Sequence, residues 1–180
     1  GGAGIQADIK TITAHRLYAE TAITAITAQN TLGVTAVQNI SPDIVAAQID
    51  AVFDDIRPSA VKIGMVSSAE IIEVIADRLS ARNATNVVVD PVMVATSGAR
   101  LIAEDAAEAL TRRLFPLATV ITPNIPEAMA LLDYEVDSER TQQNAAMLLT
   151  RRFGCASLVK GGHLVNEAND VLAEPAPLDD

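Results

Sequence analysis

The chain has 180 residues, of which 49% are hydrophobic and 20% are charged, and this composition is typical of one globular domain with a substantial core. Its formal net charge of −10 leaves no basic patch, so neither nucleic-acid binding nor adsorption to an acidic membrane is expected. The one cysteine, Cys155, cannot form an internal disulfide, and with no cleavable leader or long apolar run the sequence predicts a cytoplasmic protein.

A glycine-rich turn opens the chain. Gly1, Gly2 and Gly4 precede a helical pattern that places Ile5 and Ile9 on one side. Glycines let a backbone approach a small ligand closely, and the first amides of a helix are free to bind polar or anionic groups. The spacing matches neither a dinucleotide fingerprint nor a P-loop, so a tight turn without a ligand is the alternative interpretation. Because such a turn usually joins a strand to a helix, we expect a strand upstream of Gly1.

The next two segments favour β-structure. Residues 20–29 are rich in Thr and Ile, which predicts a buried strand, and residues 34–40 show a β-like alternation. The short excursion between them could form a hairpin flap over a site. Gln29, at the end of the first segment, offers both a donor and an acceptor to a planar heterocycle, and the alternative is that it closes the turn.

Strand-like and helix-like segments then alternate along the chain. Ser41 and Ser138 are helix-start signals, Gly154 is a helix-stop signal, and Ile44 and Leu148 are among the residues expected to point inward. Strands are predicted at 60–64, 86–90, 118–122 and 156–160, helices at 42–53, 68–82, 104–114, 127–132 and 138–153, and a possible edge strand at 169–173. This order predicts a single three-layer α/β/α domain with a mainly parallel central sheet.

The junction from Thr122 to Glu127 joins a predicted strand to a predicted helix. Pro123 cannot continue a strand ladder, and Pro126 suits the first turn of a helix, so the junction should be stiff. Asn124 and Glu127 lie three residues apart at the helix start, where their oxygens could hold a hydrated Mg²⁺ against a nucleotide phosphate. The alternative is a capping box, with Asn124 as the N-cap and Glu127 reaching back to a backbone amide.

Other polar residues also follow predicted strands. Lys160 could bind phosphates or be an ordinary strand-end lysine, and Asp90 could orient metal-bound water or simply form a turn with Pro91. Met65 could fill the core or pack on an aromatic ring. His163 is expected to be structural or peripheral. If these turns share one edge of the sheet, their chemistry suits phosphoryl transfer.

Six segments resemble, in family order, the motifs of hydroxymethylpyrimidine/phosphomethylpyrimidine kinases: Gly1–Asp8, Thr27–Thr31, Lys62–Met65, Asp90–Met93, Thr122–Glu127 and Val159–His163. The family belongs to the ribokinase-like superfamily and acts in thiamine biosynthesis. The resemblance implies a ribokinase-like fold and phosphorylation, with ATP and Mg²⁺, of 4-amino-5-hydroxymethyl-2-methylpyrimidine and then of its monophosphate. Relatives are commonly dimers, which implies a homodimer here.

The resemblance also implies roles for individual residues. The pyrimidine would be bound by Gly2, Asp8, Gln29 and Met65, with main-chain contacts from Val92. The ATP phosphates would be bound by Lys160, Gly162 and Asn124. The metal would be served by Glu127, together with Asn124, and by Asp90 at one remove.

One departure from the family pattern bears on activity. Family members carry a Gly-Thr-Gly-Cys-type segment, downstream of the region that matches Ala173, which forms an anion hole and supplies the proposed base. This sequence has no such segment, and Cys155 precedes the strand and is not that base. We therefore expect the catalytic base to lie beyond Asp180, outside this chain, and we expect weak or no turnover from the 180-residue polypeptide itself. The alternatives are a pyridoxal kinase of the same superfamily and a non-catalytic fragment that binds pyrimidine or nucleotide.

Overall fold

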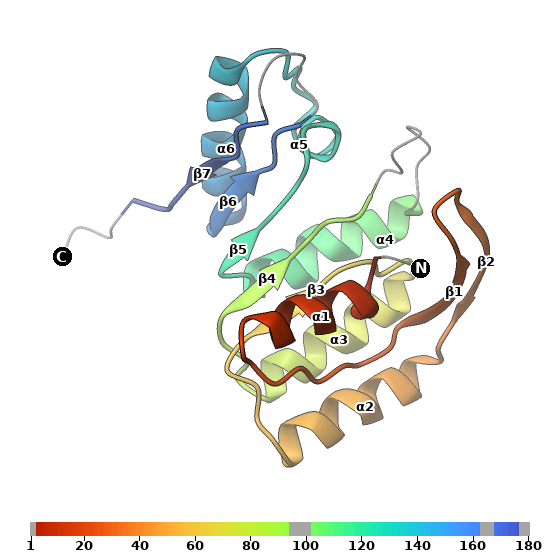
Figure 1. Cartoon of the computed structure of the whole chain (residues 1–180). Helices are drawn as coiled ribbons and strands as arrows, with labels where there is room; N and C mark the ends of the chain where they lie inside the picture. Colours follow the sequence, from red (N-terminus) through yellow and green to blue (C-terminus); the bar gives the residue numbers. More distant parts are fainter. Residues whose placement is uncertain (1–2, 94–101, 163–167, 177–180) are drawn as a thin grey trace.

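A five-stranded sheet forms the centre of the molecule in the computed structural model, which describes residues 3–93, 102–162 and 168–176 (Figure 1). The strands lie in the order β3-β4-β5-β6-β7, and all pair in parallel except β7, which is an antiparallel edge strand. The strands are β3 (Val61–Ile63), β4 (Val87–Val89), β5 (Val120–Ile121), β6 (Ala156–Val159) and β7 (Val171–Ala173). The apolar run of β4 is the kind of sequence that a parallel strand with both faces covered requires.

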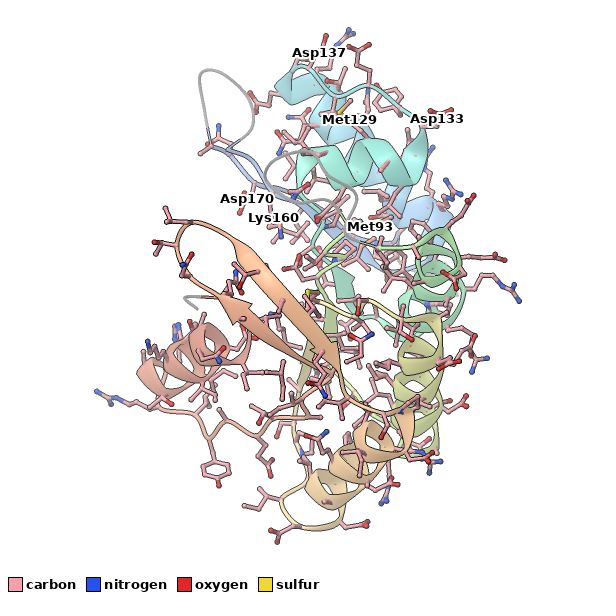
Figure 2. The ribbon with its side chains drawn as sticks, turned by 90° about the vertical axis from the view of Figure 1, so that its right-hand side faces the viewer. Met93, Met129, Asp133, Asp137, Lys160 and Asp170 are labelled. Atoms are coloured by element: carbon pink, nitrogen blue, oxygen red, sulfur yellow. The ribbon has the colours of Figure 1, made fainter. Side chains whose placement is uncertain are left out.

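Helices flank this sheet on two sides. Figure 2 shows α1 on one side of the sheet and α3 and α4 on the other, which confirms the predicted α/β/α architecture. The helices are α1 (Ile5–Ala14), α2 (Pro42–Asp54), α3 (Ala69–Ala81), α4 (Glu104–Ala109), α5 (Ile125–Leu132) and α6 (Glu139–Phe153). No helix within the described ranges has the length and apolar character needed to span a membrane.

The core lies between the sheet and the helices. Helix α3 contributes Ile71, Ile72, Ile75 and Leu79, as its 3.6-residue periodicity predicts. On α2 and α6 the buried stripes are narrower than expected: the buried set on α2 is Val45, Ile49 and Phe53, and that on α6 includes Ala145 and Leu149. The inward placement of Ile44 and Leu148 was therefore wrong, since each lies one position before its stripe and remains 54% and 40% exposed.

The predicted helix 104–114 is regular only as far as Ala109. It continues as a π-turn over Leu110–Leu114 and a 3₁₀ turn over Phe115–Leu117. A wider turn advances by a smaller angle per residue, which lets Leu110, Leu114 and Phe115 all face the core, where each is buried.

A separate two-stranded hairpin, β1 (Ala25–Gln29) with β2 (Val34–Asn39), confirms the predicted hairpin, and its role as a flap over a site stays a prediction. The first strand is five residues shorter than expected, because the backbone of Ile23 bonds to the side-chain amide of Gln48 on α2 instead of to a neighbouring strand. The base of the hairpin is tied to the turn that follows β3: the Thr24 hydroxyl donates to the Met65 carbonyl at 3.3 Å, and Ser67 donates to the Asn39 side chain at 3.0 Å. The flap therefore stands at the edge where β3 ends (Figure 1).

Candidate active site

Charged and polar side chains meet where β4, β5 and β6 end. These strands are parallel neighbours, so their carboxyl ends share one edge of the sheet. The Lys160 ammonium donates to Asp90 Oδ1 at 2.7 Å, and the Thr122 hydroxyl donates to the same oxygen at 3.2 Å. Asn124 and Lys160 extend β5 and β6 by one parallel bridge, and the Lys160 amide donates to the Pro123 carbonyl at 2.8 Å. The structure thus brings Asp90, Asn124 and Lys160 together at the predicted edge.

Helix α5 begins with a complete capping box. Asn124 Oδ1 accepts from the Glu127 amide at 2.9 Å, and Glu127 Oε2 accepts from the Asn124 amide at 2.8 Å. The capping alternative considered from the sequence is therefore present. It leaves the side-chain NH₂ of Asn124 without a hydrogen bond to any described residue, so this group is available to a ligand.

The carboxylate of Glu127 also holds the loop that follows β4. It is only 2% exposed, and its second oxygen, Oε1, accepts from the Met93 amide at 3.3 Å. Burial raises the pKa of this carboxyl above its ordinary value, although the two amides and nearby Lys160 act in the opposite direction. Glu127 thus connects the start of α5 to residues 90–93, because it accepts one hydrogen bond from each segment. No sequence pattern predicts this contact, because Met93 and Glu127 are far apart along the chain.

The donor set suits a hydrated metal ion better than a closed metal cage. No group of three or more His, Cys, Asp or Glu side chains converges on one point in the part of the chain that the structure describes. Both oxygens of Glu127 accept amide hydrogen bonds, whereas Asp90 Oδ2 accepts none from the described residues. Mg²⁺ keeps several waters and commonly uses only one or two carboxylates. Asp90 therefore fits such an ion directly, and Glu127 fits it through water.

The loop after Lys160 is fastened at its base. The buried side chain of Gln142 donates to the carbonyls of Val159 and Asn169 at 3.0 and 2.9 Å, and the Gly161 amide donates to Asp170 Oδ1 at 2.8 Å. A Cβ at Gly161 would lie 2.3 Å from the Asn169 carbonyl oxygen, so only glycine fits this close approach. Gly162 follows with φ of 88°, a left-handed conformation that favours glycine. Lys160 and Asp170 lie near each other in Figure 2.

Sequence reasoning missed Gln142 and Asp170. One weak feature of the sequence could have identified Gln142, since it is a polar residue on the buried side of α6. No sequence feature identifies Asp170.

Three of the residues predicted to bind the substrate ring, Asp8, Met65 and Val92, lie beside β3 or just after β3 and β4. Met65 is half-buried beside the hairpin base, and Asp8, on the first turns of α1, pairs with Lys62 at 3.0 Å. Val92 is half-buried, and its amide donates to the Asp90 carbonyl at 2.9 Å. Gln29 ends β1 near the hairpin turn and contacts none of the cluster residues through a hydrogen bond within the described ranges.

Gln29 does not close the hairpin turn. Asn30 closes it instead, because its side-chain oxygen accepts from the amides of Leu32 and Gly33 at 2.8 and 3.2 Å.

Four positions named in the sequence analysis lie outside the described residues: Gly1, Gly2, His163 and Asp180. The expected location of the catalytic base beyond Asp180 therefore stays a prediction, and so does the contact of Gly2 with the pyrimidine.

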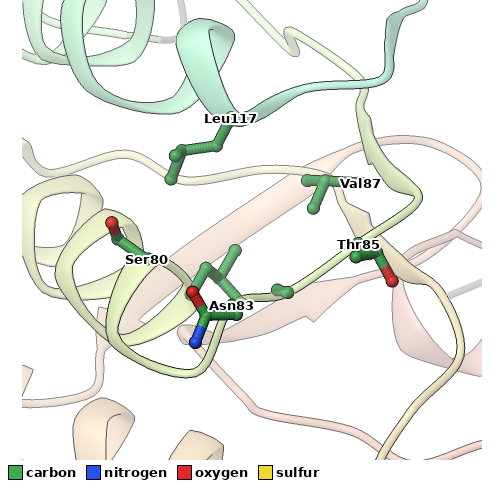
Figure 3. Close-up of a pocket in the computed structure, with 7 residues that line it drawn as sticks. Ser80, Asn83, Thr85, Val87 and Leu117 are labelled. Atoms are coloured by element: carbon green, nitrogen blue, oxygen red, sulfur yellow. The ribbon is translucent and has the colours of Figure 1, made fainter.

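A surface pocket of about 280 Å³ lies elsewhere (Figure 3). It is lined by the end of α3, the loop before β4, and Leu117. Val87, the first residue of β4, lines this pocket, whereas Asp90 follows the last residue of that strand. The pocket is therefore at the opposite edge of the sheet from the charged cluster and does not contribute to it.

Comparison with known proteins gives one consistent family. The model of the phosphomethylpyrimidine kinase family matches residues 1–178. A hydroxymethylpyrimidine/phosphomethylpyrimidine kinase from Rhizobium meliloti (strain 1021) is 53% identical over 176 residues, which cover 96% of this chain and 65% of that relative. The chain thus spans slightly less than two thirds of the length of that curated relative.

Solved structures agree with the sequence comparison. A phosphomethylpyrimidine kinase from Clostridium difficile 630 superposes with a TM-score of 0.91 at 47% identity, covering 97% of this chain and 76% of that one. The Bacillus subtilis pyridoxal kinase, solved as an ADP complex, gives a TM-score of 0.84 at 36% identity, covering 97% of this chain and 66% of that one. On the family match and on these similarities, the chain belongs to the phosphomethylpyrimidine kinase family.

Proposed function

We propose that this protein transfers a phosphoryl group from ATP to the 5-hydroxymethyl group of 4-amino-5-hydroxymethyl-2-methylpyrimidine and then phosphorylates the resulting monophosphate, in thiamine diphosphate biosynthesis. The observation that carries the proposal is the cluster of Asp90, Thr122 and Lys160 at the ends of adjacent parallel strands. Phosphoryl transfer depends mainly on positioning and on charge stabilisation, and this cluster supplies both a cation and a carboxylate. The names of the relatives support the same reaction.

In this proposal the nucleotide phosphates bind beside Lys160. Its ammonium has three donors, of which one is directed at Asp90. The free side-chain amide of Asn124 and the backbone at Gly162 would add neutral donors around the same anion. Because Gln142 and Gly161 fasten the base of this loop, the lysine is held in place before the nucleotide arrives.

Asp90 is the residue that we propose for direct metal binding, with Glu127 acting through water. When bound, Mg²⁺ would neutralise part of the phosphate charge. Glu127 has a second role in this scheme: by holding the amides of Met93 and Asn124, it orients the loop that carries Asp90 relative to the start of α5.

We propose that Gly2, Asp8, Gln29, Met65 and Val92 line the pyrimidine side of the site. Support comes from the hairpin base, which is bonded to Met65, and from the ion pair that joins Asp8 to Lys62 of β3. We assign no general base among the described residues.

Cys155 does not suit the role of general base. It is buried, burial raises the pKa of its thiol, and it precedes the first residue of β6 while Lys160 follows the last.

A coupled ADP-release assay on the full-length gene product, with the pyrimidine alcohol and pyridoxine in parallel, tests the proposal. We expect a higher kcat/KM for the pyrimidine alcohol, since the pyrimidine kinases are more similar to this chain than the pyridoxal kinase is. A preference for pyridoxine would replace the proposed substrate, and ligand binding without turnover would indicate a binding protein. We also propose a cytoplasmic homodimer, which sedimentation analysis and cell fractionation would test.

A further inference from the structure

Among the described residues, one side-chain pair links helix α1 to the sheet through hydrogen bonds. None of its ten residues, all of which the structure describes, is buried. Within the described ranges, the only hydrogen bonds and ion pair that link α1 to another element run from the Lys62 ammonium to Asp8, at 3.1 Å to Oδ1 and 3.0 Å to Oδ2. One ammonium thus holds both oxygens of the carboxylate that we place at the pyrimidine.

The geometry of β3 allows this contact. Lys62 is its middle residue, and the next residue, Ile63, is buried on the opposite face. Gly64 lies two residues after Lys62 and so on the same face. A Cβ at Gly64 would be 3.0 Å from the Lys62 ammonium nitrogen, and its backbone is not in the left-handed region. Gly64 therefore matters for the space that it leaves, and it lets the ammonium reach Asp8.

We propose that Lys62 is a positioning residue for the substrate: by holding Asp8, it fixes the carboxylate and the first turns of α1 at the edge where the pyrimidine binds. This inference rests on the proposed function, because only that function gives Asp8 a ligand. The side chains of Lys62 and Asp8 are 38% and 35% exposed, so solvent limits the strength of the pair. Its loss should therefore appear in ring binding rather than in global stability.

The test is calorimetric titration of the full-length protein with the pyrimidine alcohol and, separately, with a non-hydrolysable ATP analogue. For Lys62→Met we expect pyrimidine affinity to fall about fivefold, with nucleotide affinity and melting temperature unchanged. Lys62→Arg should restore most of the affinity. Gly64→Ala should weaken binding in the same direction, because its methyl group displaces the ammonium. The matched control is Lys10→Met, which removes an exposed ammonium of α1 that contacts no described residue through a hydrogen bond or ion pair.

A double-mutant cycle separates positioning from general damage. In an Asp8→Asn background, Lys62→Met should cause no further loss of pyrimidine affinity, since the lysine acts through that carboxylate. Equal losses for both ligands, a lowered melting temperature, or additive losses in the cycle would overturn the proposal.

The calorimetric titration distinguishes failure of the proposed function from failure of the Lys62 proposal. If the proposed function is wrong, the wild-type protein does not bind the pyrimidine at all. In that case the substrate role of Lys62 fails with it. Hydrogen exchange over residues 5–14 decides separately whether Lys62 anchors α1: faster exchange in Lys62→Met alone supports the anchor, and unchanged exchange removes it.

Discussion

Removal of the Glu127 carboxylate should lower the free energy of unfolding, and the size of the loss should follow from the two hydrogen bonds that the carboxylate accepts. Glu127→Ala leaves the amides of Met93 and Asn124 without their acceptor. An unsatisfied buried donor costs about 1–3 kcal/mol, and loss of the buried charge offsets part of the sum, so we expect about 2–4 kcal/mol. Glu127→Gln keeps one acceptor oxygen and turns a donor toward the other amide, so we expect about 1–2 kcal/mol.

The same carboxylate predicts a pH dependence with a definite sign. Burial raises the pKa of Glu127 above the ordinary value of 4.5. Between pH 4.5 and the raised pKa, the native state therefore binds more protons than the unfolded state. The contribution that protonation of Glu127 makes to the free energy of unfolding is fully present below about pH 4.5, and it is lost as the pH rises through the raised pKa. The difference in unfolding free energy between wild type and Glu127→Gln should therefore decrease as the pH rises through this window.

Urea unfolding over a pH series, followed by circular dichroism, measures both effects. Glu139→Gln is the matched control, since Glu139 is an exposed carboxylate at the start of α6, and it should change stability by less than about 0.5 kcal/mol. If Glu127→Ala lowered the free energy of unfolding by less than about 1 kcal/mol, the hydrogen bonds of Glu127 would not hold the loop after β4 in place. A wild-type advantage over Glu127→Gln that grew with pH would contradict the raised pKa.

Three further predictions concern the phosphate side of the site. Lys160→Met should weaken nucleotide binding at least about tenfold in calorimetry, because a charge-assisted contact is lost, with little change in melting temperature. Gly161→Ala should destabilise the protein by about 1–3 kcal/mol in urea unfolding, because its methyl group would meet the Asn169 carbonyl, whereas Gly33→Ala has no neighbour within 4 Å and should be near neutral. Gln142→Leu removes the side-chain donor to the buried Val159 carbonyl and to the Asn169 carbonyl, and it should cost about 1–3 kcal/mol in the same assay.

Local signals predicted the parts of the fold that depend on neighbouring residues. The two prolines and the Asn124–Glu127 spacing predict the start of α5 and its capping box, and both are observed. The apolar run before Asp90 predicts β4, because a strand covered on both faces carries no polar alternation. Parallel pairing of such strands then requires their carboxyl ends to meet, which is why the Asp90 and Lys160 neighbourhood could be anticipated.

Contacts between distant residues were beyond the reach of sequence patterns. Residues 20–24 have the Thr and Ile content of a strand, but the side chain of Gln48 satisfies the Ile23 backbone, and the ladder begins only at Ala25. The bond from Met93 to Glu127 and the anchoring of Asp8 by Lys62 likewise depend on the tertiary fold. Side-chain contacts between residues far apart in the sequence leave no periodic signal, so only the structure reveals them.

The pairing of Lys160 with Asp90 bears on which nucleotide form the site can accept. The two charges neutralise each other at 2.7 Å, and side-chain exposures of 37% and 25% keep the pair open to exchange. If Lys160 turns to a phosphate, Asp90 loses its counter-charge beside a new anion, which is unfavourable. If Asp90 gains a cation at the same moment, each residue again faces an opposite charge. Under the proposed function, Asp90 and Lys160 would therefore bind MgATP as a unit, and free ATP would leave the Asp90 carboxylate uncompensated.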